Sequence, residues 1–178
     1  MHTWPLLSLL IWVPAIGGAL VLATGNSRPA QARWIALASA LLVLALCVPL
    51  YNGLDAGNAS MQFVERHAWF PAINTWYSLG VDGISVALIG LTAFVTVLTL
   101  VGAWEVIEDR VHQYFASFLF LEALMIGVFC ARDALLFYVF FEAMLVPMFI
   151  IIGVWGGPRR VYATTKFFLY TFFGSIFM

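Results

Sequence analysis

Long apolar runs alternate with short polar stretches along the whole chain. Five runs are long enough to form membrane-crossing helices, and they cover residues 5–23, 34–51, 84–103, 114–131 and 134–155. A sixth run starts near residue 162 and is still apolar at residue 178. A helix that crosses the hydrocarbon core of a bilayer needs about 20 mostly apolar residues. The pattern predicts an all-α, polytopic transmembrane helix bundle with five complete spans and a truncated sixth.

The composition agrees with a membrane protein and excludes other classes. Hydrophobic residues make up 63% of the chain and charged residues only 10%, against about 25% charged in an ordinary soluble domain. The mean hydropathy is +0.99. Eight basic residues against nine acidic ones leave no basic excess for a nucleic-acid partner, and the hydrophobicity is too high for a disordered chain. We therefore predict an integral multi-pass membrane protein that is surrounded by the lipid bilayer.

The positions of the arginines predict the orientation in the membrane. The loops that follow the first, third and fifth runs share one side and carry Arg28, Arg33, Arg110, Arg159 and Arg160. The other side carries only Arg66 and Arg132. Because an excess of basic residues marks the cytoplasmic side, the N-terminus is predicted to lie outside. The segment 52–78 then forms an external loop in which a short hairpin can fold, and Asp82 caps the helix that follows it.

The sixth run is short for a span. As a helix it would measure about 24 Å, against roughly 30 Å for the hydrocarbon core. We interpret residues 1–178 as a single membrane domain that forms the N-terminal part of a longer protein. A natural protein of five and a half helices is the alternative.

One acidic residue lies near the middle of the fifth run. Glu142 is about 3 Å from the midpoint of that run, where an acid costs about 2.5–3.5 kcal/mol to insert. This depth favours a proton-exchanging site, and a structural hydrogen bond between helices is the alternative. Pro147 leaves the carbonyl of Ala143 without its helical partner, which predicts a kink one turn beyond Glu142. Tyr138 lies one turn before Glu142 on the same face.

Two further ionisable residues lie inside apolar runs. Glu122 occupies the middle of the fourth run, where it is either a second proton site or the hydrogen-bond partner of a neighbouring helix. Lys166 is the only lysine and shares a helix face with Tyr162 and Tyr170. It either lines a hydrated path or extends its amine to the cytoplasmic surface. Together with Tyr138, these two residues are candidates for a proton path that includes Glu142.

The sequence contains no motif for a cofactor or a metal. Cys47 and Cys130 lie inside apolar runs, with no CxxC motif or Cys/His cluster, and no glycine-rich phosphate-binding loop is present. The small residues Gly90, Thr96 and Gly102 of the third run are typical of close helix packing. We expect neither a metal site nor a cofactor-binding site in this chain.

Several segments resemble one family. Residues 137–148, which include Glu142 and Pro147, resemble the fifth membrane helix of the antiporter-like subunits of respiratory complex I, the proton-translocating NADH–quinone oxidoreductase. Within this family, the Met-Leu-Val-Pro-Met sequence and the following Trp155-Gly156 are similar to the chain 4 (subunit M) group. Residues 163–168 and 79–85 continue the similarity. The resemblance extends from about residue 63 to residue 178 and is weaker over the first two spans.

The resemblance implies a fold and a function. Members of the family have about fourteen helices in two inverted repeats, and they carry protons in the membrane arm while other subunits transfer electrons from NADH to quinone. NADH, flavin, iron–sulfur clusters and quinone are then held by partner subunits, and the other membrane-arm subunits are the partners of this chain. The expected location is the inner membrane of a bacterial cell.

The resemblance also assigns a role to one residue. Glu142 matches the helix-five glutamate of the family, which pairs with a lysine on helix seven. That helix lies beyond the present sequence, and Lys166 is one helix too early to replace its lysine. Two alternative functions stay open: a subunit of a multi-chain sodium/proton antiporter, and a structural membrane scaffold whose buried acids only hold helices together.

Overall fold

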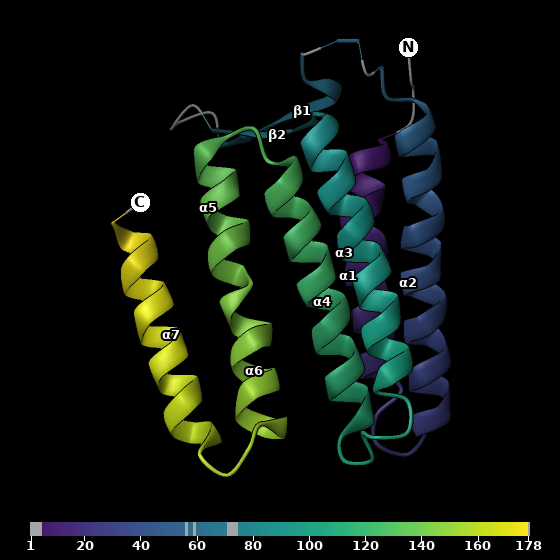
Figure 1. Ribbon diagram of the computed structural model, residues 1–178, viewed down its shortest axis with the longest axis vertical. Helices are drawn as coiled ribbons and strands as arrows, with labels where there is room; N and C mark the ends of the chain where they lie inside the picture. Colours follow the sequence, from purple (N-terminus) through teal and green to yellow (C-terminus); the bar gives the residue numbers. More distant parts are fainter. Residues whose placement is uncertain (1–4, 56, 59, 71–74, 178) are drawn as a thin grey trace.

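The computed structural model describes residues 5–55, 57–58, 60–70 and 75–177. In this part of the chain, seven helices form a bundle in which the fifth and sixth helices lie end to end, and a two-stranded sheet lies at one end of the bundle (Figure 1). The elements, in chain order, are α1 (Leu6–Ala23), α2 (Pro29–Asn52), β1 (Gln62–Phe70), β2 (Thr75–Val81), α3 (Gly83–Gly102), α4 (Val111–Cys130), α5 (Ala134–Ala143), α6 (Leu145–Trp155) and α7 (Arg160–Ile176).

The five predicted spans are confirmed. The helices α1 to α4, and α5 with α6 taken together as Ala134–Trp155, are each long and apolar enough to cross a membrane. The chain is thus an integral multi-pass membrane protein. Four helices begin before their apolar runs: α2 begins at Pro29, whose fixed φ suits a first helical turn, and α3, α4 and α7 begin at Gly83, Val111 and Arg160. The helix α7 has 17 residues and ends at Ile176, and Met178 lies outside the described residues.

Small residues bring the first helices close together. The helix α1 packs against both α2 and α4, and α2 also packs against α3. Ala32, Ala36 and Ala40 repeat every fourth residue on the buried face of α2, which allows the backbones to approach closely. A methyl group at Gly17 of α1 would collide with the side chain of Ser39. These contacts make α1 to α4 a four-helix unit. The helix α7 packs against α6 at the edge of the whole bundle (Figure 1).

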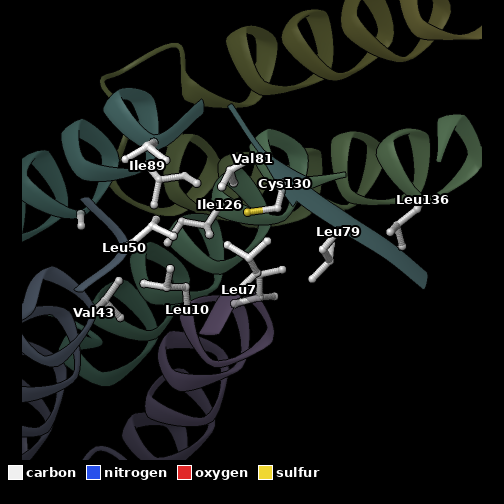
Figure 2. Packing of buried hydrophobic residues seen from close by; sticks show 13 residues of the cluster. Leu7, Leu10, Val43, Leu50, Leu79, Val81, Ile89, Ile126, Cys130 and Leu136 are labelled. Atoms are coloured by element: carbon white, nitrogen blue, oxygen red, sulfur yellow. The ribbon is translucent and has the colours of Figure 1, made fainter. Parts of the chain in front are cut away.

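The hydrophobic core at the sheet end of the bundle includes the sheet itself. Figure 2 shows the side chains that meet there from α1, α2, α3, α4 and β2, among them Leu7, Leu50, Leu79, Ile89 and Ile126. Cys130 lies in this cluster and Cys47 packs against it, and both cysteines are free. The strand β2 is therefore anchored by burial of apolar side chains, which contributes about 25 cal/mol per Å² of apolar surface.

The sheet is an antiparallel hairpin. Gln62 of β1 pairs with Val81 of β2, and the register shifts between Gln62 and Glu65, near Phe63, whose φ is 53°. The second strand continues to Val81, three residues past the predicted end of the external loop at residue 78. The predicted cap of the next helix is confirmed, because the Asp82 carboxylate accepts a hydrogen bond of 2.7 Å from the Ser85 N–H. This hydrogen bond lowers the pKa of Asp82 below its ordinary value.

The two ends of the bundle differ in charge. The loops α1–α2, α3–α4 and α6–α7 lie at the end opposite the hairpin (Figure 1), and they carry or adjoin five of the seven arginines. One of these, Arg33, donates from Nη2 to the carbonyl oxygen of Ile107 at 2.9 Å, which ties α2 to the α3–α4 loop. The grouping of arginines at one end agrees with the predicted topology, and the assignment of that end to the cytoplasm stays a prediction.

Candidate functional site

The fifth span is broken next to Glu142. The helix α5 ends at Ala143 and α6 begins at Leu145, with Met144 in a turn between them. Pro147 lacks an N–H for the carbonyl of Ala143, and its ring crowds that carbonyl. We predicted a kink one turn beyond Glu142, whereas the interruption lies two residues beyond it. The reason is that a proline disturbs the turn that precedes it in the chain.

Glu142 is linked to the last helix of the described chain. Its side chain is half-buried, and its Oε1 accepts a hydrogen bond from the Ser175 hydroxyl of α7. Ser175 is buried, and its Oγ also lies 2.8 Å from the carbonyl oxygen of Phe172. Because a hydroxyl carries one hydrogen, Ser175 can donate to only one of these two acceptors at a time. The carboxylate of Glu142 and the carbonyl oxygen of Phe172 therefore compete for the same hydrogen.

The other residues predicted near Glu142 lie apart from this contact. Lys166 is exposed, and its Nζ donates to the Tyr162 hydroxyl at 3.3 Å. It lies 5.4 Å and 5.7 Å from the ring centroids of Tyr162 and Tyr170. Ser175 lies nine positions after Lys166 on α7, which is about 14 Å along the helix axis. The structure therefore places the lysine near the arginine-bearing end and does not bring it to Glu142.

Tyr138 lies on α5, one turn before Glu142, and its side chain is half-buried. No hydrogen bond joins the two side chains in the structure as described. Its place on the Glu142 side of α5 agrees with the helical spacing, and its role in a proton path stays a prediction.

Glu122 lies at a separate place in the bundle. It is 1% exposed on α4, and among the described residues neither of its carboxylate oxygens has a hydrogen-bond partner. The side chain lines a cavity of about 270 Å³ between α3 and α4. Of the two roles that the sequence left open, a direct hydrogen bond to a neighbouring helix is not present in this part of the chain.

A second cavity reaches the break in the fifth span. It has a volume of about 550 Å³ and lies between α4 and α6, with Leu22 of α1 also in its wall. Ala143 and Pro147 line it beside the break, and Gln113 and Ser117 line it from α4. The two polar residues lie in the first two turns of α4, so the polar part of the cavity faces the arginine-bearing end.

Two family models together match most of the chain. A model described as "NADH-ubiquinone oxidoreductase chain 4, amino terminus" matches residues 34–131. A second, described as "NADH:quinone oxidoreductase/Mrp antiporter, TM", matches residues 131–178. The chain belongs to the NADH-ubiquinone oxidoreductase chain 4 family. The second model starts at the end of α4, so it covers the broken span and α7.

Named members of the chain 4 family are similar to nearly the whole chain. NADH-quinone oxidoreductase subunit M of Rhodobacter capsulatus is 49% identical over 177 residues, which are 97% of this chain and 34% of the relative. NADH-ubiquinone oxidoreductase chain 4 of Arabidopsis thaliana is 43% identical over 173 residues, 97% of this chain and 35% of the relative. The chain thus spans about a third of the length of the curated relatives it matches.

Solved structures show the same arrangement of helices. A chain of respiratory complex I from Thermus thermophilus with bound NADH has a TM-score of 0.79 and 30% identity, over 95% of this chain and 33% of that one. A chain of the Mrp complex from Dietzia sp. DQ12-45-1b has a TM-score of 0.80 and 17% identity, over 96% of this chain and 18% of that one. The second likeness concerns the fold alone.

The similarity to the chain 4 family is longer than the sequence motifs suggested. The motifs placed the resemblance from about residue 63 onward, whereas the family model begins at residue 34 and the relatives match 97% of the chain. The early spans consist of common apolar residues, in which a motif is hard to recognise.

One residue with a clear structural role in this chain 4 family member was not predicted. Glu65 of β1 accepts hydrogen bonds from the Leu7 N–H at 2.8 Å and the Ser8 N–H at 3.2 Å, and from the Ser8 hydroxyl. It therefore caps the N-terminus of α1 from 57 residues away in sequence, where the helix dipole favours a negative charge. Tyr77 lies next to this contact, 3.4 Å from the Ser8 hydroxyl, and burial raises its pKa.

Replacing Glu65 by Ala is expected to lower the free energy of unfolding by about 1–3 kcal/mol, because two N–H groups at a helix N-terminus lose a charged acceptor. Denaturant titration of the purified protein in detergent measures the change. The matched control is Glu105→Ala, which removes an exposed acid at the other end of the bundle and should change stability by less than about 0.5 kcal/mol. Equal effects of the two substitutions would show that the Glu65 contact does not hold the hairpin to α1.

Proposed function

We propose that this chain is part of a membrane-arm subunit of NADH–quinone oxidoreductase in the inner membrane of a bacterial cell. In this proposal it takes part in proton translocation that is coupled to electron transfer from NADH to quinone. Membership of the chain 4 family supports the proposal. The observation that carries it is the position of Glu142, a carboxyl group beside a helix break in the middle of a span.

The proposed roles of this chain and its partner subunits are supported by its membership of the chain 4 family. NADH, flavin, iron–sulfur clusters and quinone are held by partner subunits, and other membrane-arm subunits lie beside this one. The chain itself performs no redox catalysis and contributes to the enzyme as a proton-carrying subunit. Its own chemistry is the uptake and release of a proton at Glu142, with Glu122, Lys166 and Tyr138 as further members of the path.

Ser175 makes the two protonation states of Glu142 structurally distinct. When Glu142 is ionised, the Ser175 hydroxyl donates to the carboxylate. When Glu142 carries a proton, the carboxyl can donate to Ser175 Oγ while the hydroxyl donates to the carbonyl oxygen of Phe172. In this proposal, the cavity that Ala143 and Pro147 line beside the break admits water toward Glu142.

The free energy needed to move a proton across the membrane is similar in size to the free energy of the hydrogen bonds at Glu142. Moving one charge against 100 mV costs about 2.3 kcal/mol, and a hydrogen bond to a charged group contributes about 1.5–3 kcal/mol. The free energy of a change of charge at a neighbouring buried group, together with that of the Ser175 hydroxyl changing its acceptor, is therefore large enough to drive proton uptake or release at Glu142. The energy itself comes from the electron transfer in the partner subunits.

A sodium/proton antiporter subunit is the second candidate. Its support is the similar fold of the Mrp complex chain and the description of the family model over residues 131–178. The similarity to the curated relatives favours the oxidoreductase, because the two relatives compared above are oxidoreductase subunits and match 97% of this chain.

Inverted membrane vesicles that contain the complete protein separate the two candidates. We expect NADH to acidify the vesicle interior to the same extent in sodium-free and sodium-containing medium, because the proposed site exchanges protons. A pH-sensitive dye measures the acidification, and vesicles from a strain without the gene are the control. Sodium-driven proton movement that depends on this gene and occurs without NADH would identify the antiporter instead.

A further inference from the structure

The cavity between α3 and α4 is lined mainly by apolar side chains, with four polar side chains among them. Thr92, Thr96 and Thr99 line it from α3, and Glu122 lines it from α4, among apolar side chains. The three threonines are spaced by four and three residues, so they share one face of α3. The cavity volume of about 270 Å³ has room for several water molecules, since each occupies about 30 Å³ in the liquid. Four polar side chains thus converge on a space large enough for water.

The threonine hydroxyls of this lining already donate their hydrogens to backbone carbonyl oxygens of α3. Thr92, Thr96 and Thr99 donate to the carbonyl oxygens of the residues four positions earlier, at 2.8, 2.9 and 2.9 Å. Each hydroxyl oxygen keeps lone pairs that can accept a hydrogen bond. The lining therefore offers acceptors to the cavity and no donors. An ionised carboxylate needs donors, whereas a protonated carboxyl has an O–H to donate, so the lining is complementary to the protonated form.

No cation on the helices that pack against α4 neutralises Glu122. The helices α1, α3 and α6 contain no charged residue, and α5 contributes another acid, Glu142. The only charged residue of α2 is Arg33, whose guanidinium binds the Ile107 carbonyl in the α3–α4 loop. Among the described residues no cation balances a charge on Glu122, which favours a carboxyl group that carries a proton supplied through water.

We propose that the α3–α4 cavity is a hydrated proton-binding site, in which Glu122 holds a proton and water connects its carboxyl group to the hydroxyl oxygens of Thr92, Thr96 and Thr99. The proton is bound reversibly, with the carboxylate and a proton from water forming the carboxyl group. Water is required because neither Glu122 oxygen reaches a protein partner directly among the described residues. This site is distinct from the contact between Glu142 and Ser175, and it stands whether or not Glu142 carries the transported proton.

Infrared spectroscopy of the complete complex in liposomes tests the site. We expect the wild-type spectrum to contain the carbonyl stretching band of a protonated carboxyl group that shifts when H₂O is replaced by D₂O. Glu122→Gln should remove this band, in an amount equal to one carboxyl group per complex. Glu142→Gln and the surface control Glu105→Gln should both retain it. Loss of proton translocation in Glu142→Gln without loss of this band would separate the two sites.

Thr96→Val provides a second test that leaves Glu122 in place. Valine has nearly the same shape as threonine but no hydroxyl acceptor, so the carboxyl band is expected to shift in frequency. Ser117→Ala is the matched control, because that hydroxyl donates to the Gln113 carbonyl and lines the other cavity. An identical carboxyl band in wild type and Glu122→Gln would overturn the proposal, and so would a Glu122 band that does not respond to D₂O.

Discussion

Replacing Glu142 by Gln in the complete protein is expected to reduce proton translocation to the level of a strain that lacks the gene, while the complex still assembles. Glutamine has the same size, and its carbonyl oxygen can still accept the hydrogen bond of Ser175, but it cannot exchange a proton. The helix contact should therefore survive and the proton transfer should not. NADH-driven acidification of inverted vesicles measures the transport, and a native gel measures the amount of assembled complex.

Two further variants make this result specific. Glu142→Asp keeps a carboxyl group on a shorter side chain and should retain part of the transport, whereas Glu108→Gln removes an exposed acid of the α3–α4 loop and should change nothing. The scaffold hypothesis predicts the opposite pattern, since there the acid only holds helices together. Reduced stability of Glu142→Gln with undiminished acidification would therefore support the scaffold and contradict a proton role for this residue.

Local features of the sequence predicted much of the fold. The length of an apolar run is enough to identify a span because the hydrocarbon core has a fixed thickness, and all five complete spans followed from this. Asp82 was recognised as a cap because a cap bonds to an N–H only three residues away. Glu142 could be singled out for a similar reason, since its depth in the membrane follows from its position within one run.

Contacts between residues that are far apart in the sequence could not be predicted from such local features. Ser175 lies 33 residues from Glu142, and Glu65 lies 58 residues from Leu7, so neither pairing leaves a periodic signal. Thr96 was attributed to helix packing because a small residue in a span has that role by default. Its place in the wall of the Glu122 cavity depends on the packing of α3 against α4, which the local sequence does not reveal.

The helix α5, which carries Glu142, packs against α4, and Gly127 of α4 lies at this contact. A Cβ atom at Gly127 would lie 2.8 Å from the ring of Phe140, which precedes Glu142 by two residues. Gly127→Ala is therefore expected to push α5 away from α4 and to lower the free energy of unfolding by about 1–3 kcal/mol. Proton translocation should fall as well, because Glu142 moves with α5 relative to Ser175.

Gly90→Ala is the matched control for this substitution. A Cβ atom at Gly90 of α3 has nothing within 4 Å, so the same change should leave stability unaltered or raise it by up to about 1 kcal/mol through helix propensity. In the double variant Gly127→Ala/Phe140→Leu the smaller side chain makes room, and its loss of stability should be smaller than the sum of the two single losses. Denaturant titration in detergent and NADH-driven acidification measure the two effects. Additive losses would mean that Gly127 and Phe140 do not meet, and that the position of Glu142 is fixed by some other contact.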